Sequence, residues 1–193
     1  MNERKIDAKW CREWGGRYGD QRLAELFDRP MTVPEVMTRR DGPWRSVKAA
    51  DRLWVFFRAA SRAAQAVVAN RAADRQVRAY CLHSGVDAVE RWAARWLSDE
   101  DRSAAAAWRA TCVARAGATV EAAEWAAEAA AWAAEGASAR TAETLAAMAT
   151  AAWVARMAAW AGDARGSAEN EAQIADAIQV LAADEAAKEN NHG

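Results

Sequence analysis

The chain has 193 residues, of which 52% are hydrophobic and 11 are tryptophan, and its formal net charge is −1. That length can bury a substantial core in one domain. No stretch approaches the roughly 18 uncharged apolar residues of a membrane span, and the first residues lack the apolar region of a secretory signal, so we expect neither.

The charges are distributed unevenly along the chain. Residues 1–80 carry 17 Lys and Arg against 10 Asp and Glu, whereas residues 81–193 carry 9 against 17. The basic half could attract an anionic partner, or it could complement the acidic half across an internal or subunit interface. The second interpretation is the commoner one in a compact chain.

Residues 1–45 contain all three prolines and the closely spaced Gly15, Gly16 and Gly19. This composition predicts an irregular N-terminal segment with short helices at about 21–28 and 33–40. Thr32 is suited to cap the second of these helices, because threonine is a favoured N-cap residue. Pro34 would then lie in the first turn, where proline is tolerated. Residues 46–189 are expected to form an alanine- and tryptophan-rich helical domain.

Helical periodicity continues from residue 46 without proline. The pattern predicts a helix over 46–61 with Leu53, Phe56 and Phe57 on its apolar face and Arg52 on the opposite, polar face. A second helix is predicted over 74–97, with Gly85 on the buried side and His83 on the surface. A residue without a side chain would let two backbones approach closely there.

The second half of the chain predicts four further helices, over 98–115, 118–135, 138–161 and 167–188. Ser98 begins a sequence typical of a capping box, and glycines separate the later segments. No strand-like alternation appears. We therefore predict an all-α fold, an antiparallel array of about six helices after a short irregular segment.

Two of these helices have unusual faces. In the helix over 118–135, alanines including Ala126, Ala127, Ala130 and Ala133 form one face, and Trp125 and Trp132 lie on the other side beside glutamates. The helix over 138–161 is apolar on all sides, and Arg156 lies between Trp153 and Trp160. That guanidinium could hold an anion or could pair with an internal glutamate.

Arginine near tryptophan marks the candidate ligand-binding residues, because guanidinium groups hold phosphate and indoles stack on bases. These residues are Trp44, Arg45, Lys48 and Arg52 in the first half, and Trp153, Arg156 and Trp160 in the second. They could equally be ordinary surface arginines and core tryptophans. No catalytic, metal or phosphate-loop motif occurs, so we expect a protein that is not an enzyme and has no cofactor.

The cysteines indicate the compartment. Cys11, Cys81 and Cys112 form no Cys-x-x-Cys pair and are typical of small buried hydrophobes. Such cysteines suit a reducing environment, so a cytoplasmic location is expected, in the host cytoplasm if a phage encodes the protein.

Several sequence features resemble a known family. They are Asp51-x-Leu53-Trp54, a cysteine helix from Tyr80-Cys81 to Trp92 and Trp96, Asp99-x-Asp101-Arg102, and alanine arrays interrupted by tryptophan. Over residues 44–160 this order resembles the immunity proteins of bacteria and phages, although Ser103 stands where a proline is expected. The resemblance implies an all-helical, non-enzymatic protein of microbial conflict.

Three functions are compatible with these features. The first is sequestration of a small anionic, nucleotide-derived immune signal to blunt a host defence. The second is an immunity protein that neutralises a toxin through the acidic face around Glu121, Glu124 and Glu128. The third is a structural homo-oligomer, with a dimer as the first expectation. Both the tryptophan face and the alanine face have to be buried against another surface, and a second subunit could provide it. Nucleic-acid binding is less favoured because the net charge is slightly negative, and no membrane partner is expected.

Overall fold

The computed structural model describes residues 5–14, 18–116, 126–127, 129–131, 133 and 163–190. The fold is all-α, and the described part contains one isolated antiparallel bridge, between Ile6 and Met31. Its helices are α1 (Ala8–Glu13), α2 (Asp20–Leu26), α3 (Val33–Thr38), the 3-10 helix η1 (Gly42–Ser46), α4 (Ala49–Ala59), α5 (Arg62–Gln76), the π-helix η2 (Val77–Cys81), α6 (Asp87–Leu97), α7 (Ala104–Ala116) and α10 (Asp163–Asn190).

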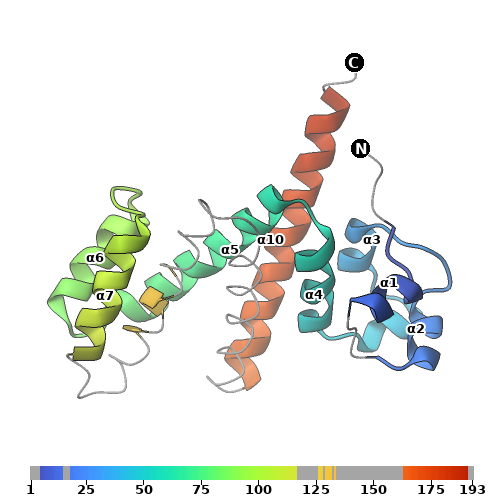
Figure 1. Cartoon of the computed structure of the whole chain (residues 1–193), viewed down its shortest axis with the longest axis horizontal. Helices are drawn as coiled ribbons and strands as arrows, with labels where there is room; N and C mark the ends of the chain where they lie inside the picture. Colours follow the sequence, from blue (N-terminus) through green and yellow to red (C-terminus); the bar gives the residue numbers. More distant parts are fainter. Residues whose placement is uncertain are drawn as a thin grey trace.

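The described helices form groups along the longest axis of the molecule (Figure 1). Helices α1, α2 and α3 lie at one end and the α6–α7 pair at the other, with α4, α5 and α10 between them (Figure 1). No helix within the described ranges is long and apolar enough to span a bilayer.

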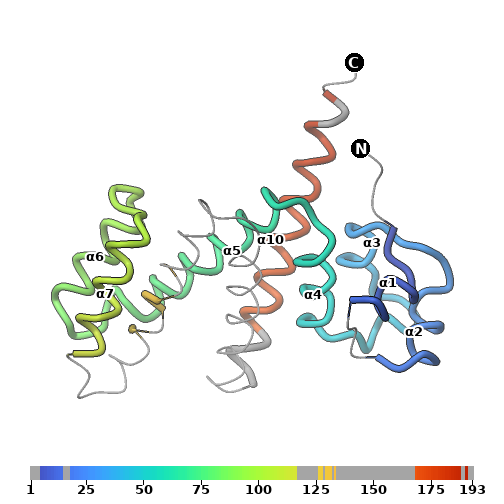
Figure 2. The backbone as a smooth tube through the Cα atoms, viewed as in Figure 1, coloured from blue at the N-terminus to red at the C-terminus, as the bar shows by residue number. Residues whose placement is uncertain are grey.

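A first hydrophobic core joins residues from both ends of the sequence. Leu23, Val36 and Phe56 are buried together with Ile174 and Val180 of α10. Helix α10 therefore lies beside α4 and α5, as the backbone trace shows (Figure 2). The domain boundary expected between residues 45 and 46 falls within this cluster, because the N-terminal helices and α4 share the same core.

The N-terminal segment is more ordered than its glycines and prolines indicate. Helices α2 and α3 confirm the two predicted short helices, and Thr32 caps α3 with a full capping box. The Glu35 N–H donates to Thr32 Oγ1 (3.3 Å), while the Thr32 N–H donates to Glu35 Oε2 (2.6 Å). Helix α1 was not predicted, although Asp7 caps it by accepting from the Trp10 N–H at 2.7 Å.

Glu35→Gln tests this cap through its pH dependence. The hydrogen bond from Arg29, together with the Thr32 N–H, lowers the Glu35 pKa to about 2. A carboxyl whose pKa is depressed on folding stabilises the native state above its unfolded pKa and loses that contribution as the pH falls. Because the pair is partly exposed, the variant should lose no more than about 1 kcal/mol near neutral pH. Urea unfolding should show this difference shrinking from about pH 4.5 towards pH 2; a difference independent of pH would contradict the assignment.

The helix predicted over 74–97 is wrong as one continuous element. Helix α5 ends at Gln76, a π-turn follows, and α6 starts at Asp87. Gly85 has a φ of +74°, is exposed, and would place a Cβ in open space. Its role is therefore to form the turn before α6 and not to permit close packing. His83 is exposed, as predicted.

A second core lies under α6 and α7. Trp92, Trp96 and Cys81 are buried there with alanines of the 118–135 segment, and burial of Ala126, Ala127, Ala130 and Ala133 agrees with the predicted alanine face. Asp74 joins three elements by accepting from Trp96 Nε1 (2.8 Å) and from Arg102 (2.7 Å). Helix α7 begins later than predicted, because Ser103 and not Ser98 provides the cap, accepting from the Ala106 N–H.

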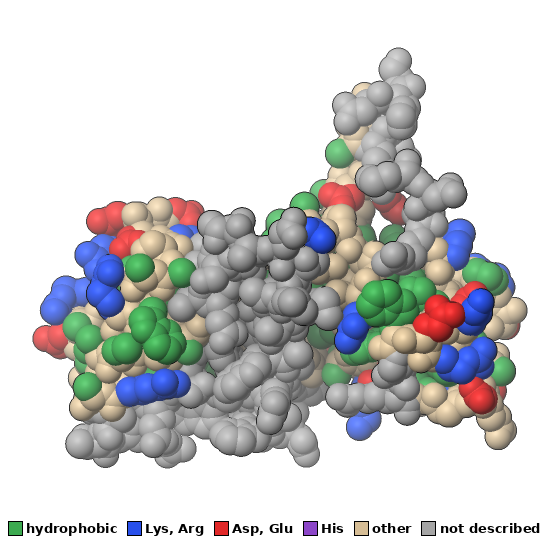
Figure 3. Space-filling model, viewed as in Figure 1, with side chains coloured by type: hydrophobic (Ala, Val, Ile, Leu, Met, Phe, Trp, Pro, Cys, Tyr) green, Lys and Arg blue, Asp and Glu red, His purple; other side chains and the backbone are tan. Residues whose placement is uncertain are grey.

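The cysteines divide in a way that the sequence did not predict. Cys11 and Cys81 are buried, and burial raises the pKa of each thiol to about 12. Cys112 is exposed on the outer face of α7 next to Trp108, which is 54% exposed, and Val113. Hydrophobic side chains gather over α7 on this face (Figure 3). This exposed apolar surface of Trp108, Cys112 and Val113 is compatible with a subunit contact. The homodimer stays a prediction.

Opposite charges from the two halves of the chain meet between α5 and α10. Arg75 contacts both Glu169 (2.9 Å) and Asp176 (2.6 Å), and Arg71 also contacts Asp176 (2.9 Å). The uneven charge distribution thus serves internal packing at these positions, in agreement with the commoner of the two interpretations.

Candidate functional site

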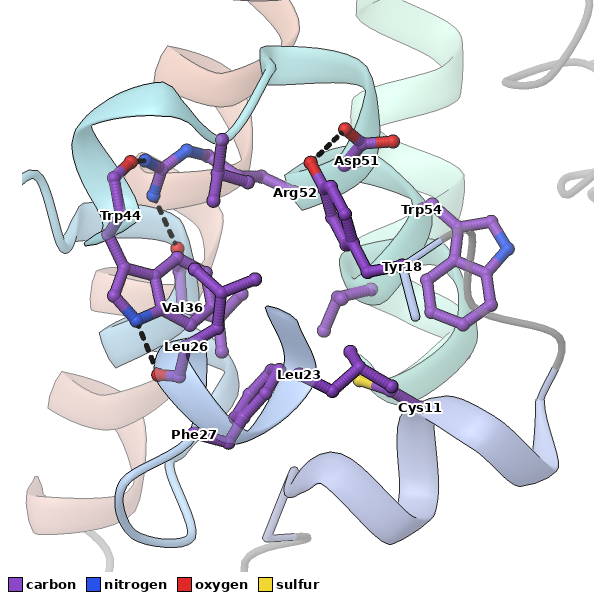
Figure 4. A pocket seen from close by; sticks show the side chains of 12 residues that line it. Cys11, Tyr18, Leu23, Leu26, Phe27, Val36, Trp44, Asp51, Arg52 and Trp54 are labelled. Carbon is purple, nitrogen blue, oxygen red and sulfur yellow. Dashed lines mark hydrogen bonds between the residues drawn. The ribbon is translucent and has the colours of Figure 1, made fainter. Parts of the chain in front are cut away.

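The N-terminal helices surround an aromatic pocket, whose space including its opening is about 440 Å³. Five segments line it: α1, α2, α3, the stretch around η1, and α4 (Figure 4). Its wall is formed by Cys11, Tyr18, Leu23, Leu26, Phe27, Val36, Trp44, Val47, Asp51, Arg52, Trp54 and Val55. Its wall is of the kind found in small-molecule sites, which are usually apolar with a few placed polar groups.

The polar groups of the pocket are concentrated at one side. The Tyr18 hydroxyl donates to Asp51 Oδ2 at 2.6 Å. Burial and this hydrogen bond raise the pKa of Tyr18 to about 12, so the phenol stays protonated near neutral pH. Asp51 Oδ1 accepts no hydrogen bond from the described residues. It is therefore available to a donor from outside.

Trp44 and Arg52, two of the predicted site residues, lie together in the pocket wall with their donors directed at backbone oxygens. Trp44 Nε1 donates to Leu26 O at 2.7 Å. The Arg52 guanidinium donates to Val36 O (2.9 Å), Arg39 O (2.5 Å) and Trp44 O (2.7 Å), and its carbon lies 5.5 Å from the Trp44 ring centroid. Arg52 is 2% exposed, which corrects its predicted place on a polar helix face.

Burial has an electrostatic consequence for Arg52. It lowers the pKa of the guanidinium to about 10, and the nearby charge of Arg40 acts in the same direction. No carboxylate of the described residues forms an ion pair with Arg52. Carbonyl oxygens therefore hold the guanidinium directly, and the charge of Glu171 acts on it without an ion pair.

The other predicted site residues are not part of this wall. Arg45 and Lys48 are exposed at the surface near η1 and the start of α4. Trp153, Arg156 and Trp160 lie outside the described residues, as do Trp125 and Trp132. Their proposed contacts with a ligand stay predictions.

An arginine–indole cluster that sequence reasoning missed borders the pocket. It consists of Trp10 and Trp14 from the α1 end and of Trp54 and Arg58 from α4. The ring centroids of Trp10 and Trp14 are 6.0 Å apart, and those of Trp10 and Trp54 are 5.8 Å apart. The Arg58 guanidinium carbon lies 5.5 Å from the Trp14 centroid and 5.8 Å from that of Trp54. Trp54 belongs to both the pocket and the cluster.

The cluster reaches the surface. Trp14 is 42% exposed, and hydrophobic side chains with a basic group beside them appear over α1 and α4 (Figure 3). The sequence did contain a signal, since Trp10 and Trp14 are four residues apart and so are Trp54 and Arg58. Each pair therefore shares one helix face. What the spacing could not provide is that the two faces meet.

The described residues include no group of three or more His, Cys, Asp or Glu side chains placed to hold a metal ion. Comparison of the chain with protein-family models, with curated proteins and with solved structures gave no match.

Proposed function

We propose that this protein is a non-enzymatic binding protein that sequesters a small anionic, nucleotide-derived ligand in the aromatic pocket between α1 and α4. The observation that carries this proposal is the wall of the pocket, which is apolar and aromatic with few polar atoms. An aromatic wall suits a planar base, and the positive charges of Arg52 in the wall and Arg58 beside it favour a ligand of negative charge. In a microbial conflict, removal of such a signal would blunt the defence that it triggers.

A pocket-filling variant tests this function. Val55 lies in the pocket wall and is 6% exposed. Val55→Phe therefore replaces an isopropyl group with a phenyl ring, which extends into the space that a ligand would occupy. We expect wild-type protein to be stabilised in thermal melts by one or more members of a panel of nucleoside monophosphates and cyclic dinucleotides, and Val55→Phe to lose that shift. Calorimetric titration then measures the affinity directly.

Val67→Phe is the matched control, because it adds the same ring at a position of α5 that is 40% exposed and distant from the pocket wall. Val47→Phe, between η1 and α4, is a second pocket-filling variant if Val55→Phe unfolds. A wild-type protein that no panel member stabilises, or that binds equally well with the pocket filled, would refute this function.

A further inference from the structure

Three side chains of α4 lie on one stripe beside the pocket. Asp51, Trp54 and Arg58 are separated by three and then four residues, which places them on one side of a helix. The rise of 1.5 Å per residue puts the two ends of this stripe about 10.5 Å apart along the axis. In order, the stripe offers a hydrogen-bond acceptor, an aromatic ring and a cation.

The acceptor end is available at the pocket. Tyr18 occupies Asp51 Oδ2, whereas Oδ1 receives no donor from the described part of the chain. Arg52, the next residue, directs its guanidinium to backbone carbonyls instead. A ligand group that donates hydrogen bonds, such as the exocyclic amine of a base, would satisfy Asp51 Oδ1.

The opposite end offers only donors. Arg58 forms no ion pair with any described carboxylate, and its contacts are the ring faces of Trp14 and Trp54. Within the described ranges the indole N–H groups of Trp10, Trp14 and Trp54 donate no hydrogen bond either. A half-exposed group of donors around a cation is complementary to an anion rich in acceptor oxygens, such as a phosphate.

We propose that this stripe recognises a nucleoside monophosphate, with the amine edge of its base at Asp51, the ring beside Trp54, and the phosphate on Arg58 next to Trp14. This inference rests on the proposed function and restricts the ligand to a nucleotide with one base and one phosphate. The separation of the two polar ends matches the extended length of one nucleotide.

Adenosine 5′-monophosphate and adenosine form a matched pair of probes that differ in the phosphate. Calorimetric titration should show that Arg58→Gln weakens binding of the monophosphate about tenfold to a hundredfold, the range of a lost charge-assisted contact, and leaves adenosine binding unchanged. Arg91→Gln, on the exposed side of α6, removes an equal charge far from the stripe and should change neither affinity.

Asp51→Asn tests the other end, since an amide oxygen can still accept from Tyr18. Wild-type protein should prefer adenosine monophosphate to inosine monophosphate, which has a carbonyl in place of the amine. The variant should lose that preference while keeping its dependence on Arg58. Thermal melts without ligand verify that each variant is folded.

The possible failures are distinguishable. Equal affinity of wild type and Arg58→Gln for adenosine monophosphate would overturn the stripe but not the pocket, provided that Val55→Phe still abolishes binding. Binding of cyclic dinucleotides without any monophosphate would also overturn the stripe alone. If no nucleotide in the panel binds, the proposed function fails, and this inference fails with it.

Discussion

Replacing Arg52 with methionine should lower the free energy of unfolding by about 3–5 kcal/mol, because it removes a charged donor from three hydrogen bonds in the core. Its guanidinium is the common donor for three backbone oxygens, those of Val36, Arg39 and Trp44. Methionine fills much of the same space but donates nothing. The penalty is therefore that of orphaned buried acceptors, about 1–3 kcal/mol each before relaxation.

Urea unfolding of Arg52→Met and Arg52→Lys gives the measurement. Lysine keeps the charge but lacks the planar fork that reaches carbonyls on two sides, so it should recover only part of the loss. Arg45→Met is the control, because Arg45 is exposed on the adjacent 3-10 helix and its loss should change stability by less than about 0.5 kcal/mol. Equal stability of Arg52→Met and wild type would contradict a structural role for the guanidinium.

Replacing Arg75 with methionine should also cost about 3–5 kcal/mol, because it leaves Glu169 without its cation and Asp176 with only the more exposed Arg71. Glu169 and Asp176 both contact Arg75, and their side chains are only 11% and 14% exposed. This ion group joins α5 to α10, so its loss should loosen the attachment of the C-terminal helix. Hydrogen exchange should show that Arg75→Met speeds exchange of the α10 amides relative to wild type, and speeds it more in α10 than in α6.

Arg71→Met provides a control within the same helix. Arg71 also contacts Asp176, but its side chain is 43% exposed, so its removal should cost no more than about 1 kcal/mol. Adding Glu169→Gln and Asp176→Asn to Arg75→Met should recover most of the lost stability, because the uncompensated charges are then removed. A triple variant no more stable than Arg75→Met would mean that packing, and not charge, holds α10.

Local patterns predicted much of this fold. The spacing of apolar residues and the Thr32 cap located α2 and α3, and periodicity located the C-terminal helix, since these signals act within a few turns. Arg52 shows the limit of such patterns. A helical wheel gave it a polar face, but the C-terminal end of α3 and the stretch around η1 fold over that face and supply carbonyl oxygens. One sequence does not reveal which segment will cover a given helix face.

The candidate site depends even more on tertiary contacts. Trp44 and Arg52 were predicted as neighbours because they are close in the chain, and they do meet at the pocket wall. The contact between Trp14 and Arg58 joins residues 44 positions apart and brings together two helix faces that were each visible separately. The pocket forms where side chains from five segments meet, and no single segment contains the information that they meet there.

The place of α10 has a consequence for the order of folding. Ion pairs and hydrogen bonds link it to α5 and Ser61 across 94 to 123 residues of chain. Closing such long loops is entropically costly before the contacts form, which slows folding relative to bundles of local hairpins. A nascent chain leaving the ribosome can assemble the α6–α7 pair from contacts near in sequence. The part of its N-terminal core that packs against Ile174 and Val180 stays uncovered until α10 has been synthesised.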